Sequence, residues 1–126
     1  MKLTVIILRI VLGLMLFAFG LSSLFELMEL PKFSVPGQHF MDALISTGYM
    51  MPQIALFKIF VGLSLLSNRF VPLFLVIFFP ISINMLLFHL FLDIKGIAGS
   101  LIIFLLNVIL LFMHLNSYKL LLKSKT

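Results

Sequence analysis

The stretch from Phe70 to Asp93, FVPLFLVIFFPISINMLLFHLFLD, decides the fold class of this chain. A helix needs about 20 apolar residues to cross a bilayer core about 30 Å thick, so the stretch is long enough to span a membrane. It also carries Pro80, Asn84 and His89 within its apolar run. Lipid offers no partners for free backbone groups or polar side chains, so we expect these residues to face protein or a cavity.

The composition of the whole chain also indicates a membrane protein. Its 126 residues are 63% hydrophobic and 10% charged, whereas soluble domains have about 45–50% apolar and about 25% charged residues. The chain has no cysteine, which excludes disulfides, iron–sulfur clusters and cysteine-based zinc sites. Its net charge of +5 comes from basic residues at segment ends. That distribution indicates membrane topology, and we expect no nucleic-acid partner.

Four apolar segments are long enough to cross the bilayer, at about residues 3–28, 49–67, 70–93 and 97–116. They predict an all-α, integral membrane four-helix bundle that forms a single domain over residues 1–126. In the outer connection, residues 29–48, Pro31, Pro36 and Gly37 interrupt regular structure. Residues 38–47 can form a short amphipathic helix at the interface. This helix is either an ordered cover over the helix ends or a moving lid.

The basic residues predict the orientation. With four crossings, one side of the membrane carries Lys2, Arg9, Arg69, Lys119, Lys123 and Lys125. The other side has Lys32 and Lys95 together with all four acidic residues, which are Glu26, Glu29, Asp42 and Asp93. The positive-inside rule then places both termini in the cytoplasm. A cleaved signal peptide is the other interpretation of the first segment, but Arg9 interrupts its apolar run, so we expect it to be retained.

Most polar residues of the segments gather in the half of the membrane opposite the termini. Counting 1.5 Å per residue from the outer face places them about 3–16 Å deep, in the order Glu26, His89, Lys58, Asn84 and Asn107. Together with Asp93, one helical turn after His89, they form the candidate ligand-binding set. The chain shows no phosphate loop, metal triad or pair of nucleophile and base, so we expect no catalysis by this chain alone.

Two of these positions carry charge or can acquire it. Lys58 can extend along its aliphatic stem to the outer interface, or it can form an ion pair with Glu26. His89 and Asp93 share a helix face, so the carboxylate can orient the imidazole for hydrogen bonding or proton exchange. Alternatively, His89 only caps the end of its helix.

The amides and small residues of the segments favour helix packing. Asn84 and Asn107 lie near mid-membrane, where interhelical hydrogen bonds contribute about 0.6–2 kcal/mol each. Gly13 and Gly20 share a face of the first segment, and Gly62 lies in the second. Such residues let two helix backbones approach closely, within one bundle or between protomers.

Several runs in the chain resemble the DoxX-like family of small four-helix bacterial membrane proteins. They are TGYMMP at residues 47–52, NRFVPL at 68–73, PISIN at 80–84 and LFHLFLD at 87–93. The resemblance covers nearly the whole chain and implies a bundle in the bacterial inner membrane. Through the related DoxD/DoxA thiosulfate:quinone oxidoreductase subunits it also implies a role beside redox enzymes or quinones. The chain departs from the family at Ser23 and Lys58, where relatives carry a basic residue and a glutamate.

These features together suggest a membrane subunit that binds a small amphipathic ligand such as a quinone. In this interpretation Asn84 and His89 bind a quinone oxygen, Asp93 orients His89, and Lys58 with Glu26 sets the local charge. Phe78, Phe79 and Phe88 would form apolar walls around the ring. Two alternatives remain open, a structural or assembly subunit and a small oligomeric transporter.

Overall fold

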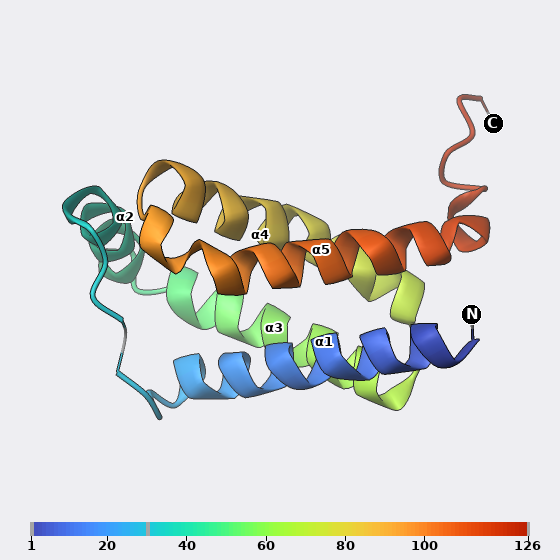
Figure 1. The fold of residues 1–126 in the computed structure, drawn as a ribbon, viewed down its shortest axis with the longest axis horizontal. Helices are drawn as coiled ribbons and strands as arrows, with labels where there is room; N and C mark the ends of the chain where they lie inside the picture. Colours follow the sequence, from blue (N-terminus) through green and yellow to red (C-terminus); the bar gives the residue numbers. More distant parts are fainter. Residues whose placement is uncertain (1, 30, 126) are drawn as a thin grey trace.

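The computed structural model describes residues 2–29 and 31–125, and this part of the chain is helical with short connections. Four long helices form an antiparallel bundle: α1 (Lys2–Leu24), α3 (Met50–Ser67), α4 (Val71–Phe91) and α5 (Ile97–Met113). A shorter helix, α2 (Val35–Ser46), lies across the end of the bundle opposite both termini (Figure 1). Positions 1, 30 and 126 of the predicted domain lie outside the described residues.

The predicted fold class is confirmed. Four helices of the described chain are long and apolar enough to cross a membrane, with the 3-10 turn η1 (Ile94–Gly96) extending α5 at its start. The protein is therefore a multi-pass membrane protein whose apolar surfaces face lipid. The short helix predicted at residues 38–47 is also present, but it begins earlier, at Val35. Pro36 and Gly37 therefore lie in its first turn and do not interrupt it, because proline is tolerated there and Ser34 caps the helix by accepting a hydrogen bond from the Gly37 N–H.

Helix α1 ends four residues earlier than predicted. The backbone at Glu26 has a φ of 52°, and the Leu27 N–H bonds to the Ser22 carbonyl at 3.0 Å. This is a Schellman-type helix end, which usually has glycine at the left-handed position. Because Glu26 takes that position, the sequence carries no obvious stop signal. The carboxylate lies exposed beyond the helix, so the prediction that Glu26 belongs to the first span was wrong.

Three glycines bring α1 and α3 into close contact, as predicted. A Cβ on Gly62 would lie 2.8 Å from the backbone nitrogen of Phe17 and 2.9 Å from the Gly13 carbonyl oxygen. A Cβ on Gly20 would lie 2.9 Å from the Ala55 carbonyl oxygen. The two backbones touch along this seam, which larger residues would force apart.

Asn107 joins α4 and α5 in the core. Its amide nitrogen donates to the Leu75 carbonyl at 3.2 Å, and its amide oxygen accepts from the Ser82 hydroxyl at 2.9 Å. The residue is fully buried among the side chains of the core, which are chiefly Leu12, Leu16, Val61, Leu65, Leu75, Phe78, Ile103 and Leu110. The predicted interhelical amide bonds are therefore present at Asn107.

The end of the bundle that carries the termini is closed by polar bonds to backbone carbonyls. The Arg9 guanidinium donates to the Leu65 carbonyl, and the Tyr118 hydroxyl donates to the Pro72 carbonyl at 2.7 Å. The second bond docks the 3-10 turn η2 (Leu115–Tyr118) onto the start of α4. This end is packed, and the opening in the fold lies at the other end.

A candidate ligand site beneath helix α2

A cavity of about 690 Å³ lies at the α2 end of the bundle. Its walls come from α1, α3, α4, α2 and the connection that precedes α2, whereas α5 contributes no lining residue. The apolar lining is rich in aromatic and methionine side chains, namely Phe19, Phe33, Phe40, Phe88, Met28, Met41, Met50, Met51 and Met85. Thioether side chains are flexible and polarisable, so such walls adapt to a flat or irregular ligand.

Lys58 is the cation of this cavity. It lies on the same face of α3 as Ala55 and Gly62, which pack against α1, so its side chain is directed into the bundle. The ammonium group makes no ion pair or hydrogen bond with any residue in the described ranges. Extension to the outer interface and pairing with Glu26 were the two sequence-based alternatives.

The predicted pair of Lys58 and Glu26 is not formed. Glu26 lines a second cavity of about 610 Å³, which does not include Lys58. The early end of α1 places Glu26 in this outer position. The carboxylate residue that lines the same cavity as Lys58 is Glu29, which was not a candidate because it falls in the predicted outer connection, residues 29–48, beyond the first span.

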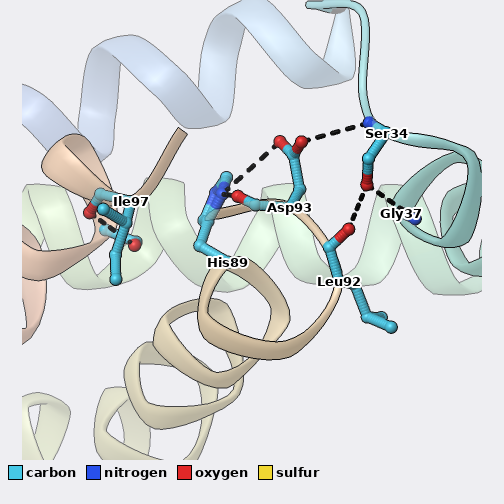
Figure 2. Close-up of polar contacts among 7 residues, drawn as sticks. Ser34, Gly37, His89, Leu92, Asp93 and Ile97 are labelled. Carbon is cyan, nitrogen blue, oxygen red and sulfur yellow. Dashed lines mark hydrogen bonds and ion pairs between the residues drawn. The ribbon is translucent and has the colours of Figure 1, made fainter. Parts of the chain in front are cut away.

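His89 and Asp93 do meet, at the junction of α4 with α2 (Figure 2). The His89 Nδ1–H donates to the backbone carbonyl of Asp93 at 3.1 Å, and the same nitrogen lies 3.8 Å from Asp93 Oδ2. The other carboxylate oxygen, Oδ1, accepts the backbone N–H of Ser34 at 3.1 Å. Asp93 is therefore buried between the cavity histidine and the start of α2.

The start of α2 is docked on the end of α4 by these polar bonds and by aromatic contacts. The Ser34 hydroxyl donates to the Leu92 carbonyl. The rings of Phe33 and Phe40 each lie 5.4 Å from the ring of Phe88, which is the spacing of an attractive aromatic pair. Helix α2 therefore lies over the cavity, to which Phe40, Met41 and Leu44 contribute lining.

The remaining predicted residues divide between the cavity and the core. Asn84 lines the cavity, but its amide donates to the Pro80 carbonyl of its own helix at 2.8 Å, so the predicted interhelical bond is absent for this residue. Asn107 is buried and does not line the cavity. Of the predicted phenylalanine walls only Phe88 is present, because Phe78 lies in the core and Phe79 stacks on Phe104.

The cavity can hold a ligand through a few polar groups set in apolar walls. Its polar lining comprises Lys58, Asn84, His89, Glu29, Ser22 and Ser23. Within residues 2–29 and 31–125, no three histidine or acidic side chains are grouped so that they could hold a metal ion. The methionine clustering was a signal available in the sequence, since five of the eight methionines line the cavity.

Comparisons of the chain with known protein families, with curated proteins and with solved structures found no match. The class of this protein is therefore defined by its own fold and site. It is a four-helix, multi-pass membrane protein with a covered, methionine-rich cavity at one end of the bundle.

Proposed function

We propose that the protein binds a small amphipathic molecule of the quinone class in the cavity beneath α2. The observation that carries the proposal is the cavity itself, which at about 690 Å³ has the size of a small-molecule site. Its apolar walls suit an aromatic ring and the first part of an isoprenoid tail. Its few polar side chains can orient the oxygens of the ring.

The polar residues take distinct roles in this proposal. Lys58 donates to one oxygen of the ligand and supplies positive charge within an apolar wall. Asn84 and His89 contact another oxygen from helix α4, and Asp93 acts on His89 without touching the ligand. Phe88 contacts the ring. The chain thus binds and orients, and electron transfer requires a partner enzyme that supplies a redox centre.

The wider setting is also part of the proposal. The resemblance to the DoxX-like family supports a place in the bacterial inner membrane beside a redox enzyme. The basic residues near both termini, which lie at one end of the bundle, support a cytoplasmic position for that end (Figure 1). The cavity would then open near the outer leaflet, and a homo-oligomer would place one such cavity in each copy.

Ligand binding can be tested with the full chain in lipid nanodiscs. Mass spectrometry of small molecules that co-purify with the protein should detect a quinone, and titration with decylbenzoquinone should give saturable binding above that of empty nanodiscs. Lys58→Met should raise the Kd about tenfold or more, because a hydrogen bond from a charged donor contributes about 1.5–3 kcal/mol. Lys119→Met removes the same charge from an exposed site beyond α5 and should leave the Kd unchanged.

Four results would count against the proposal. Binding no stronger than that of empty nanodiscs would refute the function, and equal affinity of wild type and Lys58→Met would refute the site. A stable complex with an oxidoreductase but without bound ligand would favour an assembly subunit instead. Solute flux into proteoliposomes that Lys58→Met abolishes would favour a transporter.

A further inference from the structure

The ring of His89 is held by its Nδ1–Cε1 edge. A Cβ on Gly96 would lie 2.7 Å from His89 Cε1 and 2.9 Å from Nδ1, so the backbone of η1 lies directly against that edge. The Asp93 carbonyl oxygen and Oδ2 lie near Nδ1 on the same edge, at 3.1 and 3.8 Å. Figure 2 shows the ring turned toward Asp93. The Nδ1–Cε1 edge of the ring is therefore packed, and the other edge carries Nε2.

The partner of Nδ1 determines where the ring carries its proton. A backbone carbonyl can only accept a hydrogen bond, so Nδ1 must be the donor in its bond to the Asp93 carbonyl. The nearby carboxylate oxygen also favours a proton on this nitrogen. A neutral imidazole has one N–H, and its other nitrogen, Nε2, is then an acceptor.

Nε2 is the nitrogen available to a ligand. It makes no hydrogen bond within residues 2–29 and 31–125. Every buried side-chain nitrogen or oxygen in these residues has a hydrogen-bond partner. Because Nε2 has no partner, it must be accessible. His89 also lines the cavity beneath α2, so an accessible Nε2 can serve as acceptor for a ligand bound there.

Asn84 adds a second acceptor on the same helix. Its amide nitrogen donates one of its two N–H groups to the Pro80 carbonyl at 2.8 Å, and its amide oxygen makes no hydrogen bond with the described residues. Among the residues that line the cavity, α4 thus contributes two unbonded acceptor atoms, Nε2 of His89 and Oδ1 of Asn84, and one remaining amide N–H of Asn84. Helix α3 contributes a donor to the same cavity, the ammonium group of Lys58.

We propose that the cavity selects the hydroxyl-bearing form of its ligand, a hydroquinone or another phenol, over the corresponding quinone. This inference rests on the proposed function and adds the chemical state of the ligand to it. A phenolic O–H can donate to Nε2 of His89, while an oxygen at the other end of the ring accepts from Lys58. A quinone carbonyl has no proton to donate, so its lone pairs would face the lone pair of Nε2 without a hydrogen bond between them.

The preference can be measured by anaerobic calorimetric titration of the full chain in nanodiscs. The probes are decylhydroquinone, its dimethyl ether and decylbenzoquinone, which share one tail and differ in whether they carry a donor. We expect the hydroquinone to bind about threefold to tenfold more tightly than the other two, which is the value of one hydrogen bond. His89→Phe keeps a ring of similar size and should abolish the difference.

His114→Phe is the matched control. His114 also bonds through Nδ1 to a backbone carbonyl, that of Leu110 at 2.8 Å, but it lies at the other end of the bundle. This variant should retain the full preference for the hydroquinone. Asp93→Asn keeps an oxygen that can accept from Ser34 and sets an amide N–H toward the ring, so it should reduce or reverse the preference.

Solid-state NMR of protein labelled with ¹⁵N-histidine shows which ring nitrogen carries the proton, whether or not a ligand binds. We expect a neutral Nδ1–H tautomer at His89 in wild type, and a larger share of Nε2–H in Asp93→Asn. An Nε2–H ring in wild type would overturn the inference, as would equal affinities for the hydroquinone and its ether. Equal affinities would leave the proposed function intact, whereas no binding of any probe would refute both.

Discussion

The contact between α1 and α3 makes a quantitative prediction for Gly62→Ala. The added Cβ would lie 2.8 Å from the Phe17 backbone nitrogen and 2.9 Å from both the Gly13 carbonyl oxygen and the Phe17 Cβ. Favourable contacts between heavy atoms begin at about 3.5 Å, so the two backbones must separate by about half an ångström or more. Forcing extra volume into a packed seam typically costs about 1–3 kcal/mol.

A second glycine isolates this steric cost. Replacing a helical glycine by alanine also increases helix propensity, by at most about 1 kcal/mol, which works against the clash. Gly99 lies in the first turn of α5, and a Cβ there would have no atom within 4 Å. Gly99→Ala therefore makes the same chemical change in open space. We expect Gly62→Ala to be less stable than Gly99→Ala by about 1–3 kcal/mol.

The comparison is made by titrating the detergent-solubilised proteins with SDS and measuring the free energy of unfolding. Gly99→Ala should match or slightly exceed wild type, and Gly62→Ala should unfold at a lower fraction of SDS. If the two variants have unfolding free energies within about 0.5 kcal/mol of each other, the close approach of α1 and α3 is not a real feature of the protein.

Three further predictions concern single contacts. Tyr118→Phe should lower the free energy of unfolding by about 1 kcal/mol through loss of the bond to the Pro72 carbonyl. Burial raises the pKa of Tyr118 above its ordinary 10.0, so wild type should also lose stability as the pH rises from about 10, where the unfolded state ionises first. Unfolding curves from pH 8 to 11 should show that this loss is smaller in Tyr118→Phe. Asn107→Leu should destabilise the protein by about 1–2 kcal/mol without changing ligand affinity, whereas Asn84→Leu should weaken ligand binding without changing stability. SDS unfolding and ligand titration measure the two effects, and the same pattern in both variants would contradict the assignment. Gly96→Ala should weaken ligand binding by displacing the His89 ring, and unchanged affinity in the same titration would argue against that packing.

Part of the candidate site was accessible from sequence because it depends on local spacing. His89 and Asp93 are four residues apart on one helix, so their contact follows from helix geometry alone. Lys58 and Asn84 were found through their cost in an apolar segment, and both line the cavity. The pairing of Lys58 with Glu26 failed because it required the first helix to continue through a residue that takes a left-handed conformation.

Other parts of the site depend on contacts between distant segments. Asn84 and Asn107 look alike in sequence, at similar depth in similar helices. Only packing shows that Asn107 bridges α4 and α5 while Asn84 bonds within its own helix and lines the cavity. Ser34 had no signal of its own, because its partners Leu92 and Asp93 lie far away in the chain.

The amino-acid sequence by itself determined the membrane class, the four spans, the short outer helix and the presence of costly polar groups within the spans. These follow from hydropathy, length and local spacing, which act along the chain. Only the tertiary structure decided which polar groups share a cavity, which bond to the backbone, and which nitrogen of His89 makes no hydrogen bond. Those outcomes depend on the rotation of each helix about its axis and on the docking of α2 over the bundle, and packing between segments sets both.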